Sequence, residues 1–164
     1  MTDEQAALLA LLLCPAYRVA QHERSDVPAD YLWLIDTFGP IYVDEFFWIL
    51  VPGSRNPALD LHAQSERFLR DVEERLEDVH SRQPVRGGKP WAVTDNGDLF
   101  LWRQQGPPDE WTVVVRDQRA DVEVDFALGT VPFLLALLRG ELRTSGAFPD
   151  DFPLDHHLVQ RLED

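Results

Sequence analysis

The twelve residues Trp91–Trp102, W-A-V-T-D-N-G-D-L-F-L-W, carry the strongest local signal for the fold. Apolar residues alternate on each side of Asp95-Asn96-Gly97-Asp98, which is the pattern of two strands joined by a tight turn. Asn-Gly accepts the two positive φ values of a type I′ turn at little steric cost, so we expect that turn type here. The stretch therefore predicts a β-hairpin.

More strands are predicted on the C-terminal side of this hairpin. A turn at Gly106-Pro107-Pro108-Asp109 leads into Trp111–Arg116, W-T-V-V-V-R, which completes an antiparallel meander of three strands. From Asp121 to Phe126, acidic residues alternate with hydrophobic ones, and this is again strand spacing. On the N-terminal side, Ile41–Val51 is rich in β-branched and aromatic residues and predicts one or two buried strands.

Four helices are predicted from their end signals and their apolar spacing. Thr2 and Gln5 form a capping box for an N-terminal helix, and Pro28 and Gly39-Pro40 bound a second one at Ala29–Phe38. A third helix follows Asp60 as its cap and runs to about His80. Its apolar stripe is Leu61, Phe68, Leu69, Val72, Leu76 and Val79. A fourth starts at Thr130 and covers the sheet up to Arg139-Gly140 with Phe133, Leu134, Leu137 and Leu138.

These elements predict one α+β domain over residues 1–164, in which a mostly antiparallel sheet with a central meander is packed by N-terminal, middle and C-terminal helices. A polar linker is expected at Ser81–Pro90. Cys14 is the only cysteine, so an internal disulfide and a cysteine-based zinc site are excluded, and we expect it to be a small buried residue. Acidic residues precede the apolar run Ala6–Leu13, which argues for a helix rather than a signal peptide. No apolar run approaches the roughly 20 residues that span a bilayer. The single cysteine fits a reducing cytoplasm, which is the expected location.

The charge of the chain restricts the class of partner. It has 29 acidic and 15 basic residues, a formal net charge of −14. Such a field repels nucleic acid and anionic lipid and speeds the encounter with a basic protein. The alternative is that the acidic surface only maintains solubility. Charge alone does not name the partner.

No residue pattern indicates catalysis, and no cofactor is expected. The chain lacks a Gly-x-Ser-x-Gly elbow and a His-Glu-x-x-His pair, and Gly87-Gly88-Lys89 is followed by Pro90 rather than by the Ser or Thr of a phosphate loop. Asp121, Glu123 and Asp125 share one strand face. Same-face neighbours on a strand stand about 6–7 Å apart and do not converge on one cation, so no metal site is predicted.

Two groups of residues are the candidate partner contacts. The first is the acidic stripe Asp121, Glu123 and Asp125, which could face a basic partner. The second is Asp44, Glu45 and Trp48, in which two carboxylates would form a rim beside an exposed aromatic side chain. The alternatives are a solvated edge strand whose charges discourage aggregation, and a bend at Asp44 and Glu45 in solvent.

Several short motifs in order also resemble a known family. They are V-P-A-D-Y at Val27–Tyr31, Phe38-Gly39, the W-x-V-T-D-N-G-D hairpin, W-T-V-V-V at Trp111–Val115, G-E-L-R at Gly140–Arg143 and F-P-D-D-F-P at Phe148–Pro153. Together they resemble the SUKH superfamily of Smi/Knr-like domains. The resemblance implies an α+β fold and a non-enzymatic binding protein, most often an immunity protein that neutralises a toxin. With the acidic charge, it predicts a basic, nuclease-type toxin as partner. The alternative it leaves open is a regulatory or scaffolding module of the Smi/Knr cell-wall signalling type.

Overall fold

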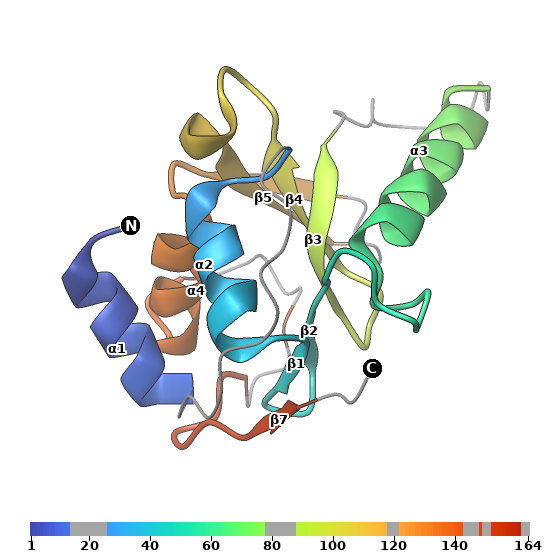
Figure 1. The fold of residues 1–164 in the computed structure, drawn as a ribbon. Coiled ribbons are helices and arrows are strands. Elements are labelled where there is room, and N and C mark those ends of the chain that lie inside the picture. The colour runs from blue at the N-terminus through green and yellow to red at the C-terminus, as the bar shows by residue number, and fades with distance from the viewer. Residues whose placement is uncertain (14–25, 78–87, 118–121, 143–147, 149–151, 162–164) are drawn as a thin grey trace.

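The structure is a computed structural model that describes residues 1–13, 26–77, 88–117, 122–142, 148 and 152–161. These residues form four α-helices and one seven-stranded sheet (Figure 1). The helices are α1 (Asp3–Leu13), α2 (Ala29–Phe38), α3 (Leu61–Glu77) and α4 (Thr130–Leu138), with a 3-10 turn η1 (Pro108–Glu110). The strands are β1 (Ile41–Val43), β2 (Phe47–Ile49), β3 (Lys89–Thr94), β4 (Leu99–Arg103), β5 (Thr112–Asp117), β6 (Val122–Phe126) and β7 (Val159–Arg161).

The sheet confirms the predicted fold class. Its strands lie in the order β6-β5-β4-β3-β2-β1-β7, and all neighbouring pairs are antiparallel. The expected meander is β3-β4-β5, and β6 continues it at one edge. Hairpin β1-β2 extends the sheet in the other direction. The edge strand on that side is β7, a three-residue strand that no pattern in the sequence indicated.

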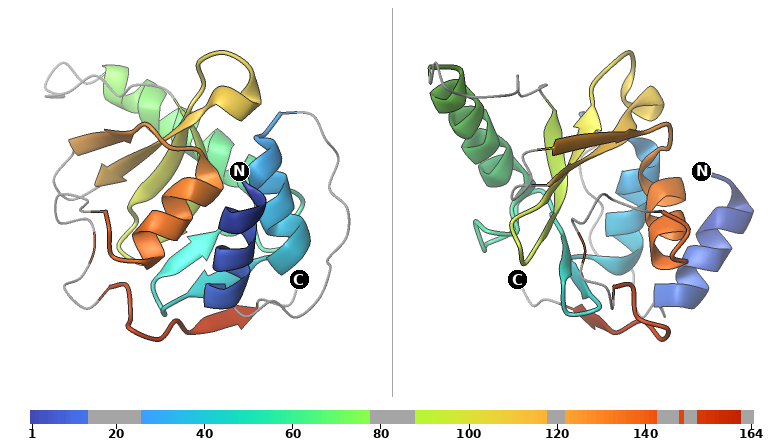
Figure 2. Two further views of the ribbon diagram at one scale, coloured as in Figure 1. Left: turned by 90° about the vertical axis from the view of Figure 1, so that its left-hand side faces the viewer. Right: turned by 180° about the vertical axis from the view of Figure 1, so that it is seen from behind.

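Helices cover the two faces of the sheet unequally. In both views of Figure 2, α1, α2 and α4 lie on one side of the sheet and α3 lies on the other; we call these the inner and the outer face. The inner face carries the main core, in which Trp91, Phe100 and Trp102 pack against α2 and α4. The outer face has only a small core, formed by Phe68 of α3 on Leu101 and Val114.

The helix ends follow the predicted signals, with one exception. Thr2 and Gln5 exchange hydrogen bonds of 2.8 and 3.2 Å as a capping box, and Asp60 accepts the Ala63 N–H at 2.7 Å. Helix α4 begins at Thr130 as expected, but the Thr130 hydroxyl accepts the indole N–H of Trp102 at 2.9 Å. The carboxylate that accepts the Val131 N–H, at 2.9 Å, comes from Asp30 in α2. The start of α4 is thereby tied to both α2 and the sheet.

The predicted hairpin is present, but its turn is not type I′. The Gly97 N–H donates to the Thr94 carbonyl at 2.9 Å, and Gly97 is the one residue of the loop with a positive φ, at 85°. This is the pattern of a type I turn followed by a left-handed glycine. The Thr94 hydroxyl donates to the Asp98 carboxylate at 2.9 Å and accepts the Asp98 N–H at 3.1 Å, which closes a three-residue loop instead of a two-residue one.

Two positive φ values in succession occur instead in the β1-β2 hairpin. Asp44 and Glu45 have φ of 53° and 52°, and the Phe46 N–H donates to the Val43 carbonyl at 3.1 Å. Residues other than glycine rarely adopt this region, because the Cβ atom approaches the following carbonyl oxygen. The hairpin therefore needs contacts elsewhere that hold this turn in place.

The apolar stripe of α3 is narrower than predicted. Leu61 and Phe68 are buried and Val72 is half-buried, whereas Leu69 is 54% exposed, so the prediction for Leu69 is wrong. Leu69 is rotated by about 100° from Phe68 around the helix, beyond the small patch of sheet that α3 covers. Glu77 ends the described part of α3, and neither the Leu76 side chain nor Val79 is described. Cys14 and most of the expected linker also lie outside the described residues, and Lys89 already belongs to β3.

Candidate partner-binding face

Strand pairing places one row of side chains across the outer face. From β1 to β6 the residues opposite one another are Tyr42, Trp48, Val93, Leu99, Arg116 and Glu123. Opposed residues of antiparallel strands point to the same face. The row begins with an aromatic pair, continues with two aliphatic residues and ends with an ion pair. Helix α3 packs on the sheet beside the two aliphatic residues.

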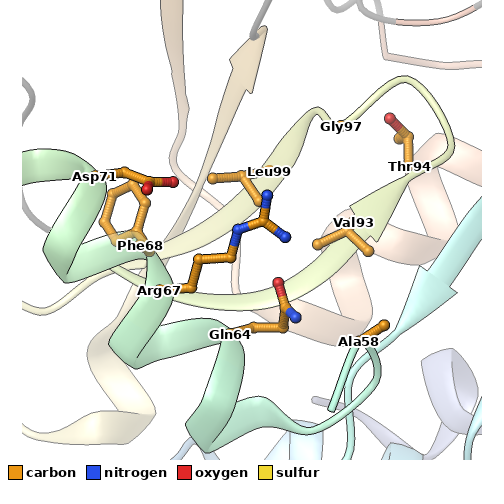
Figure 3. A pocket seen from close by; sticks show the side chains of 9 residues that line it. All are labelled: Ala58, Gln64, Arg67, Phe68, Asp71, Val93, Thr94, Gly97 and Leu99. Atoms are coloured by element: carbon orange, nitrogen blue, oxygen red, sulfur yellow. The ribbon is translucent and has the colours of Figure 1, made fainter. Parts of the chain in front are cut away.

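A groove of about 390 Å³ opens on this face between α3 and the β3-β4 hairpin (Figure 3). It is lined by Ala58, Gln64, Arg67, Phe68, Asp71, Val93, Thr94, Gly97 and Leu99. The apolar members Phe68, Val93 and Leu99 belong to α3, β3 and β4, so the groove is the space that α3 leaves beside the hairpin. Its size is that of a site for one or two side chains of a partner or for a small ligand.

The charged side chains of the groove and its one amide come from α3, and Thr94 of β3 adds a hydroxyl. Arg67 and Asp71 are exposed, and in Figure 3 the Arg67 guanidinium extends into the groove between Val93 and Leu99. Gln64 is held by a 2.9 Å hydrogen bond from its amide N–H to the Pro57 carbonyl. No hydrogen bond or ion pair within the described residues engages Arg67 or Asp71, so both are free to meet a partner.

A cluster of two aromatic side chains and a carboxylate adjoins the groove. The rings of Tyr42 and Trp48 stack with centroids 3.8 Å apart and planes inclined by 23°. The Tyr42 hydroxyl donates to Asp95 Oδ2 at 2.6 Å, and the Trp48 indole N–H donates to Asp95 Oδ1. We call these three residues the Tyr42–Trp48–Asp95 cluster. Trp48 lies opposite Val93, which also lines the groove, so cluster and groove form one continuous surface.

The environment of the cluster is negative. Burial raises the pKa of Tyr42 to about 12, and the hydrogen bond to Asp95 and the charges of Asp95 and Glu45 act in the same direction. Asp95 and Glu45 are both exposed. The Tyr42 hydroxyl therefore stays protonated at neutral pH and remains a donor to Asp95.

Of the second predicted group, Glu45 and Trp48 lie on this surface and Asp44 does not. The prediction that Asp44 lies in solvent or on an acidic rim is wrong, because its side chain is fully buried. Asp44 accepts the N–H groups of Leu154 and Leu158 at 3.2 and 2.9 Å, and its Oδ2 lies 2.8 Å from His157 Nδ1. A carboxylate satisfied in this way ties the C-terminal segment to the β1-β2 turn and holds the positive φ there.

The predicted acidic stripe does not present bare carboxylates. Arg103 lies 3.2 Å from Glu123 and 3.0 Å from Asp125, and Arg116 lies 3.3 Å from Glu123. The Glu123 side chain is 15% exposed and that of Asp125 is 50% exposed. Asp121 lies outside the described residues. Arg103 of β4 and Arg116 of β5 thus offset the charges of Glu123 and Asp125, which makes these carboxylates weak candidates for partner contacts.

Sequence patterns did not indicate that Tyr42 and Asp95 belong to the site. Asp95 was expected only as a turn residue, yet it is 47 residues from Trp48 and joins the two hairpins. The Asp95 N–H also donates to the Phe46 carbonyl at 3.0 Å. Alternation shows that Tyr42 and Trp48 can share a face, but only the pairing of β2 with β3 brings the 95–97 loop to them.

Comparisons with known proteins give no family: no protein-family model, no curated protein and no solved structure matches this chain. Within the described residues, no group of three or more His, Cys, Asp or Glu side chains is placed to hold a metal ion. The helices of that same part of the chain are all too short or too polar to cross a bilayer. The candidate site rests on the geometry of the outer face.

Proposed function

We propose that this chain is a non-enzymatic, cytoplasmic binding protein that neutralises a basic toxin by covering it with the outer face of the sheet. The observation that carries the proposal is the continuous surface formed by the groove and the Tyr42–Trp48–Asp95 cluster. It joins partly exposed aromatic rings, an apolar floor and free charged side chains. Aromatic anchors surrounded by polar groups are typical of the centres of protein interfaces.

The size of the surface favours a protein partner over a small ligand alone. A stable protein interface covers about 800 Å² on each partner, far more than one groove offers. The groove is flanked on one side by the cluster and on the other by α3, whose exposed residues include Glu66, Arg67, Arg70, Asp71, Glu73 and Glu74. An interface centred on the groove would therefore include the cluster and the exposed side of α3.

The net charge of −14 favours a basic partner. A nuclease needs a basic groove for its phosphate-rich substrate, and an acidic inhibitor can associate with such a groove rapidly and exclude the nucleic acid. The resemblance to Smi/Knr-like domains supports the same function, because that family includes immunity proteins. The same charge argues against direct binding of nucleic acid by this chain.

The test is co-expression of the tagged chain with the product of the neighbouring reading frame, followed by purification at low and moderate salt. We expect a basic protein to copurify and its nuclease or other toxic activity to be inhibited at one-to-one stoichiometry. Recovery of envelope or signalling proteins instead would favour the regulatory module. Recovery of no partner at either salt concentration would contradict the proposal.

A matched pair of charge reversals then locates the interface. Asp71→Lys changes the groove, and Glu4→Lys makes the same change of two charge units on α1, on the other side of the sheet (Figure 1). We expect Asp71→Lys to weaken binding at least tenfold and Glu4→Lys to change it less than threefold, as a rim charge outside an interface does. Equal losses for both variants would indicate attraction by net charge alone.

A further inference from the structure

We propose that the Tyr42–Trp48–Asp95 cluster is a binding site for a single arginine side chain of the partner protein. The inference rests on the proposed function, because the arginine is taken to belong to the basic protein that covers the outer face. It adds the chemical identity of one contact and a site that can be probed without that protein.

The aromatic pair supplies a stacking surface. Tyr42 and Trp48 are stacked on each other and partly exposed, and they stand on adjacent strands of the sheet. Guanidinium groups stack on the electron-rich faces of such rings within about 6 Å of the centroid. Both ring tips are already hydrogen-bonded to Asp95, so the rings lose little further freedom when a ligand binds.

Asp95 supplies an anionic acceptor that is already oriented. Its two oxygens accept one hydrogen bond each, from the Tyr42 hydroxyl and the Trp48 indole. Both donors are neutral, and a carboxylate has about four lone-pair sites, so charge and acceptor capacity remain available. Within the described residues, no lysine, arginine or histidine pairs with Asp95, and exposed Glu45 adds a second negative charge nearby.

Arginine fits this combination better than lysine. A planar guanidinium can stack on a ring and direct two parallel N–H groups at a carboxylate, whereas an ammonium group is compact and strongly hydrated. The groove beside the cluster leaves room for the residues of the partner that flank this arginine. Trp48 lies opposite Val93 and Val93 lines the groove, so neighbouring residues of the partner can reach Phe68 and Arg67.

The test uses the full chain and a small probe, N-acetyl-arginine methylamide, with the citrulline analogue as an uncharged probe of the same shape. Binding is followed by the indole N–H resonance of Trp48 in a ¹H–¹⁵N spectrum, assigned by its loss in Trp48→Phe. We expect a saturable shift of this resonance with millimolar affinity for the arginine probe, and at least a fivefold weaker response to citrulline. Equal responses to both probes, or no saturable shift, would overturn the inference.

Asp95→Asn keeps the shape of the side chain and removes its charge, and Asp155→Asn makes the same change at an exposed residue outside the cluster. The arginine response is expected to be lost in Asp95→Asn and retained in Asp155→Asn. Retention in both variants would also overturn the inference. If the chain binds the arginine probe but no protein partner is found, the proposed function is refuted while the site stands. If a protein partner binds the parent chain and Asp95→Asn with equal affinity, the site is refuted while the function stands.

Discussion

The two ends of the outer face both carry carboxylates, but the partners of these carboxylates differ. At the β6 end, Glu123 and Asp125 are paired with Arg103 and Arg116, whose charges cancel theirs. At the β1 end, the Asp95 carboxylate accepts hydrogen bonds from the neutral tips of Tyr42 and Trp48, and no cation among the described residues pairs with it. The first end is closed by its own cations, whereas the second keeps a negative charge that is fixed in position.

The difference shows that the number of acidic residues on a surface does not decide where a cation can bind. The charge of a carboxylate that is paired with arginine is already offset, so it attracts a further cation weakly, whereas a carboxylate that accepts neutral donors keeps its charge. The more densely acidic strand, β6, is thus the weaker candidate for attracting a basic protein. The sparser end, with one carboxylate and two aromatic rings, is the stronger one.

The largest expected effect on stability comes from removing the side chain that anchors the β1-β2 hairpin to the C-terminal segment. Asp44→Ala removes the acceptor of two backbone N–H groups and the neighbour of His157, leaving partly buried donors without this partner. We expect the free energy of unfolding to fall by about 3 kcal/mol, measured by urea unfolding. Asp155→Ala at an exposed position should change it by less than about 0.5 kcal/mol. An effect of Asp44→Ala as small as this control would contradict the anchoring role.

The closed end can be opened by removing Arg116. Arg116→Met should lower the free energy of unfolding by about 2 kcal/mol, because Glu123 loses a partner whose side chain is only 5% exposed. Arg139→Met is the matched control, because Arg139 pairs with Glu141 on the surface and such pairs contribute less than about 1 kcal/mol. If the two variants lose the same free energy of unfolding, the pairing of Glu123 with Arg116 is no stronger than an ordinary surface ion pair.

A smaller effect is expected when the open end loses one donor. Tyr42→Phe keeps the stacked ring and removes the hydroxyl that donates to Asp95, at a cost of about 1 kcal/mol near neutral pH. The folded-state pKa of Tyr42 is raised, so its contribution is complete below the ordinary value of 10.0 and is lost as the pH rises through about 12. Unfolding measured across this range should show a steeper loss for the parent chain than for Tyr42→Phe. If the free energies of unfolding of the two proteins fall in parallel over this pH range, the raised pKa of Tyr42 is contradicted.

The smallest expected effect tests the turn beside the cluster. Glu45 has a φ of 52°, which costs an L residue about 1 kcal/mol and glycine almost nothing. Glu45→Gly should therefore raise the free energy of unfolding by about 0.5 kcal/mol, and Glu45→Ala, which keeps the Cβ atom, should not raise it. If Glu45→Ala is more stable than Glu45→Gly, the turn is not strained.

Local rules predicted the elements of this fold well. Pro28 and Gly39-Pro40 bound α2 as expected, Thr2 and Gln5 form the predicted capping box, and the segments around Asn96-Gly97 form the predicted meander. Each of these features depends on residues close in the chain. The turn type at Gly97 was predicted incorrectly, because the side chains of Thr94 and Asp98 bond to each other across the loop.

The candidate site was less predictable, because its chemistry depends on pairs far apart in sequence. Asp44 is buried by contacts more than 100 residues away, and Glu123 is neutralised by arginines of two other strands. Alternation of acidic and apolar residues identifies the face on which Glu123 lies but not what stands beside it. Asp95 meets Trp48 only after the β2-β3 pairing is known. Composition favours a basic partner, and the distribution of the internal ion pairs favours the β1 end as the proposed place of contact.

The most direct test of the difference between the two ends is one titration observed at both ends in the same sample. N-acetyl-arginine methylamide is added to the full chain, and the indole N–H of Trp48 and the side-chain Nε–H signals of Arg103 and Arg116 are followed together. We predict a saturable shift of the Trp48 signal while the two arginine signals stay unchanged. Movement of the arginine signals at the same probe concentration, or a Trp48 signal that does not move, would contradict the account.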